Sequence, residues 1–260
     1  MKSGTGGAEG RTTGDDGKST VRSVERALDI LLCFTEGTDL AMTEIADKVG
    51  LHKSTVHRML ATLEDKGFVV RDKGTDRYRL GLKVWELSAH LSQNDDPAMV
   101  WLPEMERLRD LLGETVSIYV RDGWERIRLQ AVQSNQAVRR VAPVGVRLPL
   151  YAGASSKILV AYAEPAEREA IYGEESWAKH VDLALYKEQL KEVKQQGYAT
   201  SFEEREQGAA AISTPILDRS GRLKAALSVS GPANRLTPER LQELAPIVIE
   251  AAGRMGTMLR

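Results

Sequence analysis

The sequence predicts an α+β protein with two folded parts, and three observations support this prediction. Three amphipathic helices followed by a β-hairpin occupy the segment from about residue 21 to residue 81. An acidic break that contains a proline follows at Asn94-Asp95-Asp96-Pro97. Beyond this break, helices and extended runs are mixed without the strand–helix rhythm of a parallel sheet. We therefore expect an antiparallel sheet flanked by helices in the second part.

The bulk composition is that of a globular protein with enough residues for two cores. The chain has 260 residues, of which 42% are apolar and 28% charged, and its net charge is −1. A surface that binds nucleic acid must therefore be local. One cysteine, Cys33, excludes an intrachain disulfide and a cysteine-rich zinc site. No signal peptide or membrane-spanning run is visible, so we expect a cytoplasmic protein without a membrane partner.

The first three helices have recognisable starts and stops. The first begins after Val21 and ends before Gly37, and its apolar positions are Val24, Ala27, Leu28, Leu31 and Leu32. The second runs over Glu44–Val49, with Thr43 as its expected cap and Gly50 as its stop. The third runs from about Lys53 to Lys66 and is closed by Gly67. Extended runs at Phe68–Arg71 and Tyr78–Leu80 flank a polar turn, which completes a winged-helix layout.

The remaining elements define the expected domain boundaries. We expect a connecting helix over 82–92, further helices over 99–112, 155–163, 183–196 and 238–259, and strands over 115–120, 127–132, 209–217 and 223–230. The expected domains are a disordered tail (1–20), a winged helix-turn-helix domain (21–81), a connecting helix and linker (82–97), and a larger domain (98–260).

The third helix carries the features of a DNA-recognition helix. One face is apolar, and the opposite face carries short polar and basic side chains suited to a major groove: Lys53, Ser54, Thr55, His57, Arg58 and Thr62. Residues 52–83 contain eight Lys and Arg against four acids, a local charge of +4. A solvated helix beside a solvated hairpin is the alternative interpretation of the same pattern.

Several motifs in order resemble the IclR (isocitrate lyase regulator) family. The matching stretches are Ser23–Leu31, Glu44-Ile45-Ala46, Lys53–Leu60, Leu63–Val69 and Tyr78-Arg79-Leu80-Gly81. The resemblance implies a transcription regulator whose DNA contacts include Lys53, Thr55, His57 and Arg58. Arg58 is our first choice for reading a base, whereas Lys53 and Ser54 suit phosphates. Arg77 and Arg79 would contact the backbone or the minor groove, with a structural ion pair as an open alternative for Arg79. His52 departs from the small residue or proline that the family often has.

The second part shows no catalytic, metal or cofactor motif. Phosphate-binding and dinucleotide-binding fingerprints are absent, and the four histidines do not pair at metal-ligand spacing. Cys33 reads as a core residue. The acidic run Glu203-Glu204-Arg205-Glu206 reads as a solvated loop. We therefore expect no enzyme and no cofactor.

The second part instead resembles the effector-binding, GAF-like domain of the same family. Small residues open a helix after Leu148-Pro149, where free backbone N–H groups favour an anion. The pocket residues that the resemblance implies are Leu148, Ala154, Ser155, Ser201, Ala209, Ala211, Ser228 and Ser230. Many members have Arg-Cys after the glycine of the acidic loop, but here Ala209-Ala210-Ala211 follow Gly208. This departure weakens the case for a strongly anionic keto acid, unless Arg140 supplies a replacement cation.

The expected function is a regulator, by default a repressor, whose affinity for operator DNA changes when a small metabolite binds. The expected partners are a double-stranded, pseudo-palindromic operator, a small effector of the organic acid class, and further copies of the chain in a homodimer or a dimer of dimers. Two alternatives stay open: an interaction module that does not bind DNA, and an enzyme built on a GAF-like domain.

Overall fold

The computed structural model describes residues 20–91, 97–139, 143–174, 177 and 179–259. The predicted disordered tail lies almost entirely outside these residues, as does Arg140. The chain divides into two compact units, residues 1–87 and 88–260, and the division falls within α4 (Leu82–Leu91), which is the predicted connecting helix. Each unit is described by itself.

The N-terminal unit is a three-helix bundle with a small antiparallel sheet. Its elements are α1 (Arg22–Leu32), η1 (Cys33–Thr35), β1 (Leu40–Ala41), α2 (Met42–Val49), α3 (Lys53–Asp65), β2 (Val69–Arg71) and β3 (Arg77–Leu80). The strand order is β1-β3-β2, so the wing hairpin gains a third, two-residue strand. The predicted winged helix-turn-helix is confirmed.

The core of this unit differs in two details from the prediction. The α1 side chain that is fully buried is Ile30, and it packs with Cys33 and Phe34, which follow in η1. The cap of α2 is not Thr43: the helix begins at Met42, and Glu44 Oε2 accepts a hydrogen bond from Ala41 N at 2.6 Å. Gly50 ends α2 in the left-handed region, with φ 63°, as predicted.

The C-terminal unit is built on one six-stranded antiparallel sheet. Its strands are β4 (Thr115–Asp122), β5 (Glu125–Val132), β6 (Arg147–Pro149), β7 (Ala199–Phe202), β8 (Ala209–Leu217) and β9 (Leu223–Pro232). Its helices are α5 (Pro97–Val100), α6 (Leu102–Leu112), α7 (Ala154–Ala161), α8 (Pro165–Tyr172), α10 (Leu183–Gln196) and α11 (Pro238–Met258). The strand order is β6-β5-β4-β9-β8-β7. The predicted antiparallel sheet flanked by helices is confirmed.

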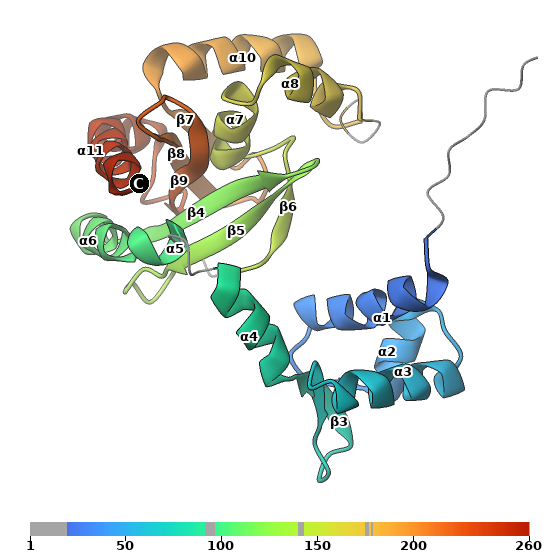
Figure 1. Ribbon diagram of the computed structural model, residues 1–260. Coiled ribbons are helices and arrows are strands. Elements are labelled where there is room, and N and C mark those ends of the chain that lie inside the picture. Colours follow the sequence, from blue (N-terminus) through green and yellow to red (C-terminus); the bar gives the residue numbers. More distant parts are fainter. Residues whose placement is uncertain (1–19, 92–96, 140–142, 175–176, 178, 260) are drawn as a thin grey trace, which may run out of the picture. The chain divides into compact units, whose positions relative to one another are not determined.

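Two cores lie on opposite faces of this sheet. Helices α6 and α11 cover one face, whereas α7, α8 and α10 lie on the other side (Figure 1). The predicted helix over 99–112 is interrupted at Trp101, because Pro103 has no N–H to donate to the preceding turn. The Trp101 indole N–H instead donates to Met255 O of α11 at 2.9 Å, which joins the two helices.

A buried carboxylate strengthens the contact between α6 and α11. Glu104 is only 6% exposed, and it accepts hydrogen bonds from Arg107 on its own helix and from Arg254 on α11. The hydrogen bond from Arg107, and then that from Arg254, hold the pKa of Glu104 below its ordinary value of 4.5. A lowered folded-state pKa means that this stabilisation is complete above pH 4.5 and is lost as the pH falls through the lowered value.

We expect Glu104→Gln to lower the free energy of unfolding by about 1–2 kcal/mol at pH 7, because it weakens two charge-assisted hydrogen bonds. The difference from the unmodified protein should shrink as the pH falls below 4.5. Urea denaturation at several pH values measures this. Glu106→Gln, at an exposed position of the same helix, is the control and should have little effect. A constant difference at all pH values would contradict the assignment.

Candidate functional site

The polar face of α3 is a candidate nucleic-acid interface. Helix α3 buries Val56, Leu60 and Leu63 in the N-terminal core, which turns its opposite face to solvent. Lys53, Ser54, His57 and Arg58 are exposed there, and Thr55 is half-buried. Within the described part of the chain, neither Lys53 nor Arg58 forms an ion pair. Their cationic groups are therefore available for phosphates or base edges.

His52 caps α3. Its Nδ1 lies 3.4 Å from Ser54 N, from which it accepts, and 2.8 Å from the Ser54 hydroxyl. The side chain thus satisfies a donor at the first turn of α3, where backbone N–H groups lack helical partners. This gives a structural role to the residue at which the sequence departs from the family pattern. It also places the Ser54 hydroxyl in a contact within the protein.

Removal of this cap is expected to destabilise the N-terminal unit. His52→Ala should lower its free energy of unfolding by about 0.5–1 kcal/mol, whereas His52→Asn, with a side chain that caps well, should retain or raise it. Thermal unfolding followed by circular dichroism measures both changes. His57→Ala is the matched control, because His57 is exposed on the same helix and forms no hydrogen bond with any described residue. Equal effects of His52→Ala and His57→Ala would argue against the cap.

The two wing arginines have different surroundings. Arg77 binds Asp39 through Nε at 3.2 Å and Glu44 through Nη2 at 2.7 Å, so it ties β3 to the start of α2. Arg79 is exposed and makes no ion pair within the described residues. This geometry favours a positioning role for Arg77 and leaves Arg79 the better candidate for a DNA contact. Gly81 is required where β3 ends, because a Cβ there would lie 2.1 Å from Gly67 O.

The second candidate site is a cavity between the sheet and α7. The open space between these elements, counted together with the solvent at its mouth, is about 430 Å³. Seven of the eight predicted effector residues line it: Ala154, Ser155, Ser201, Ala209, Ala211, Ser228 and Ser230. Strand pairing brings them together, since Ala211 lies opposite both Ser201 and Ser230. Leu148 is not among the lining residues and packs against the apolar core beside α7.

The cavity offers hydroxyl groups to a ligand. Ser155, Ser201 and Ser230 are each less than 10% exposed, and in the described part of the chain their hydroxyls have no hydrogen-bond partner. The Ser228 hydroxyl donates to Ile212 O at a long 3.4 Å. Hydroxyls that face a cavity without a protein partner depend on water or a ligand to complete their hydrogen bonds. The serines therefore favour a ligand with several oxygen atoms.

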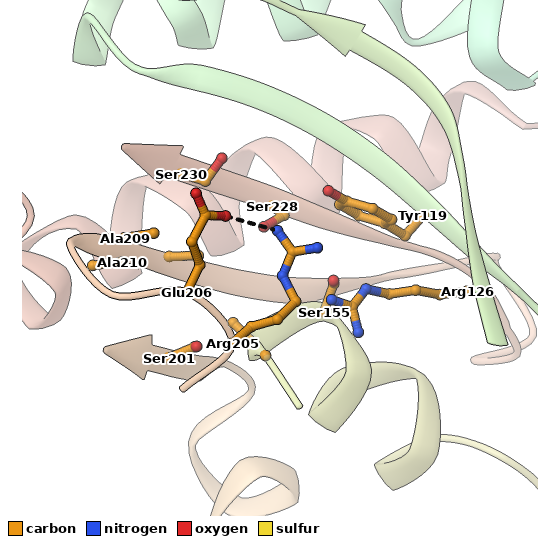
Figure 2. A pocket seen from close by; sticks show the side chains of 13 residues that line it. Tyr119, Arg126, Ser155, Ser201, Arg205, Glu206, Ala209, Ala210, Ser228 and Ser230 are labelled. Atoms are coloured by element: carbon orange, nitrogen blue, oxygen red, sulfur yellow. Dashed lines mark ion pairs between the residues drawn. The ribbon is translucent and has the colours of Figure 1, made fainter. Parts of the chain in front are cut away.

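The loop between β7 and β8 belongs to this site. The sequence predicts a solvated loop here, but the structure shows that its side chains contact α7 and line the cavity. Glu204 accepts from Lys157 Nζ at 2.5 Å and from Gly153 N at 3.2 Å. The backbone N–H of Gly153, at the start of α7, therefore already donates to a carboxylate of the protein, Glu204. The next residues, Arg205 and Glu206, line the cavity, and so does Arg126 from β5 (Figure 2). Alanines follow Gly208, where many family members have Arg-Cys. Two other arginines, Arg126 and Arg205, nevertheless line the cavity.

Comparisons with known proteins identify the family. A family model for the C-terminal part of the bacterial transcriptional regulator IclR matches residues 91–256, and a model for the IclR helix-turn-helix domain matches residues 23–73. The chain belongs to the IclR family. It is therefore a helix-turn-helix transcriptional regulator and not an enzyme.

Individual IclR-family relatives match along most of their length. The chain is 31% identical to the HTH-type transcriptional regulator BhcR of Paracoccus denitrificans, over 94% of this chain and 89% of that protein. It is 32% identical to the HTH-type transcriptional repressor AllR of Klebsiella pneumoniae, over 92% and 90% respectively. A solved structure of an IclR homolog from Microbacterium hydrocarbonoxydans, complexed with 4-hydroxybenzoate, superimposes with a TM-score of 0.79 at 26% identity and covers 92% of this chain and 99% of that one.

The described residues of this IclR-family chain contain neither a metal-binding cluster nor a membrane-spanning helix. Among the described residues, no cluster of three or more His, Cys, Asp or Glu side chains has the arrangement of a metal site. No helix in the same residues has the length and hydropathy needed to cross a membrane.

Proposed function

We propose that the protein is a repressor that binds a pseudo-palindromic operator through α3 and the wing. The observation that carries this proposal is the exposed face of α3, on which Lys53, His57 and Arg58 stand clear of the N-terminal core. The local charge of +4 over residues 52–83 favours DNA electrostatically, although the whole chain is close to neutral. Arg58 reads a base, and Lys53 contacts a phosphate. A DNA-binding regulator acts in the cytoplasm.

Operator binding requires at least two copies of the chain, and exposed apolar residues favour such an assembly. On α1 and the residue before it, Val21, Val24, Leu28 and Leu32 recur at helical spacing and are each more than half exposed. On α4, Leu82, Trp85 and Leu87 are also more than half exposed. Apolar surface of this kind marks interaction sites. We propose that it pairs two copies in a homodimer, which places two recognition helices on two half-sites.

The cavity of the C-terminal unit binds the effector, an organic acid. The unpartnered hydroxyls of Ser155, Ser201 and Ser230 and the lining arginines support this class. The relative that is complexed with 4-hydroxybenzoate has a similar fold and also holds a carboxylic acid. In the proposed domain organisation, residues 98–260 bind the effector, residues 82–97 connect it, and residues 21–81 bind DNA after a tail at 1–20. Effector binding changes operator affinity through the coupling between the two sites.

The test is a mobility-shift titration with the full chain. Duplexes from the regions flanking the gene are compared with a random duplex of the same length, at two salt concentrations. We expect at least one flanking duplex to bind about 1,000-fold more tightly than the random duplex, with affinity falling as salt rises. Organic acids are then titrated into the specific complex, and at least one should release the DNA. Equal binding to all duplexes would refute sequence-specific regulation.

A further inference from the structure

The histidine that caps α3 has a second ring nitrogen that the cap does not use. His52 is exposed, and its Nδ1 accepts from Ser54 N at 3.4 Å and lies 2.8 Å from the Ser54 hydroxyl. A neutral imidazole whose Nδ1 accepts a hydrogen bond carries its proton on Nε2. In the described part of the chain, Nε2 has no hydrogen-bond partner. The cap therefore leaves His52 with one N–H donor that is available to another molecule.

The cap also determines on which side of the helix the imidazole lies. Ser54 and Arg58 are four residues apart, so their side chains occupy the same face of α3. That face is opposite to Val56 and Leu60, which are buried in the N-terminal core. Because Nδ1 is bound to Ser54, the imidazole is held over the first turn on the exposed face. It thus lies on the face that the proposed function places against DNA.

We propose that His52 is a further DNA-contacting residue, which donates its Nε2–H to a phosphate of the operator backbone. This inference deepens the proposed function and rests on it for the approach of α3 to DNA. A phosphate oxygen accepts hydrogen bonds, so it suits an N–H donor whose tautomer is already set by the cap. Since every DNA sequence carries phosphates, His52 contributes affinity and orientation and does not select a base. One side chain thereby both caps α3 and binds the DNA backbone.

Two substitutions separate the DNA contact from the cap. His52→Asn keeps a side chain that caps well but lacks the imidazole N–H, whereas His52→Ala lacks both. Fluorescence anisotropy at pH 8, where imidazole is normally neutral, measures the affinity of the full chain for a random duplex and for the flanking duplex that binds most tightly. We expect His52→Asn to weaken both complexes about three- to tenfold, the net effect of one solvent-accessible hydrogen bond. Its thermal midpoint should equal or exceed that of the unmodified protein.

The salt dependence of binding distinguishes this neutral contact from a cationic one. A neutral imidazole releases no counterion, so the slope of log affinity against log salt concentration should be the same in His52→Asn and in the unmodified protein. Lys53→Gln, at the adjacent residue, is the comparison and should lower the affinity and also reduce the slope by about one. His180→Asn is the matched control for loss of a histidine, because His180 is exposed in the C-terminal unit. It should change neither the affinity nor the slope.

Three results for His52→Asn would overturn the inference. Unchanged affinity for both duplexes would show that His52 only caps the helix. A loss confined to the flanking duplex would indicate a base contact instead of a phosphate contact. A loss accompanied by the same fall in thermal midpoint as in His52→Ala would assign the effect to the cap. If the unmodified protein binds its flanking duplex specifically and His52→Asn does so equally well, the proposed function stands and only this inference fails. If the unmodified protein binds no duplex, both fail.

Discussion

Replacing Gly256 with alanine should lower the free energy of unfolding of the C-terminal unit by about 3 kcal/mol, the upper range for overpacking a buried position. Gly256 lies in α11 where the helix passes the end of β8, and an added Cβ would be 2.1 Å from Leu217 O. The obstructing atom is a backbone carbonyl, which cannot rotate away as a side chain does. Movement of the helix is also resisted, because the adjacent Met255 O accepts from the Trp101 indole.

The same helix provides the control for this prediction. Gly253 is exposed one turn earlier, and nothing lies within 4 Å of the Cβ that alanine would add. Gly253→Ala should therefore raise stability by about 0.5–1 kcal/mol through the higher helix propensity of alanine. Urea unfolding of the two variants should displace the midpoint in opposite directions. Destabilisation by both, or by neither, would contradict the close approach of α11 to β8.

Arg58→Ala should weaken binding to the specific operator by about 10- to 100-fold, the cost of one lost bidentate contact with a base. The affinity for a random duplex should fall much less. Non-specific binding comes from the attraction between many cationic side chains and the DNA phosphates, and this variant removes only one positive charge. Fluorescence anisotropy with both duplexes measures the ratio of the two affinities.

Lys66→Ala is the control for loss of charge alone. Lys66 follows the last residue of α3 and is exposed, away from the first turns that carry Lys53 and Arg58. This variant should change the two duplexes by similar, small factors. If Arg58→Ala and Lys66→Ala reduce specific and random binding equally, Arg58 does not read a base.

Most of the helices were predictable because their ends have strong local signals. Gly50, Gly113 and Gly197 all adopt positive φ where a predicted helix ends, and the third helix begins at Lys53 as expected. Short elements were missed for a physical reason. Strand β1 has two residues and exists only through pairing with β3, so it has no periodicity of its own. The same holds for β6, whose three residues pair with the edge of β5.

The cavity was only partly predictable. Its serines and alanines came from the resemblance to the IclR family, whereas Arg126 and Arg205 were not expected there. Alternation on β5 normally turns isoleucine and leucine inward and arginine outward, but here Arg126 and Arg128 are buried and Ile127 is only half-buried. Arg128 is held by the Tyr119 hydroxyl, a contact across strands that sequence order does not reveal. Buried cations of this kind are exceptions to hydrophobic patterning and are common at functional sites.

The two faces of β8 and β9 separate ligand choice from folding, and this has an evolutionary consequence. Successive residues point to opposite sides of the sheet. The side toward α7 carries small residues at the cavity: Ala209, Ala211, Ser228 and Ser230. The other side carries Ile212 and Val229 in the core beneath α6 and α11. Mutations at the small positions can reshape the cavity one methyl or hydroxyl at a time without disturbing that core, so a duplicated gene could acquire a new inducer while its product still folds.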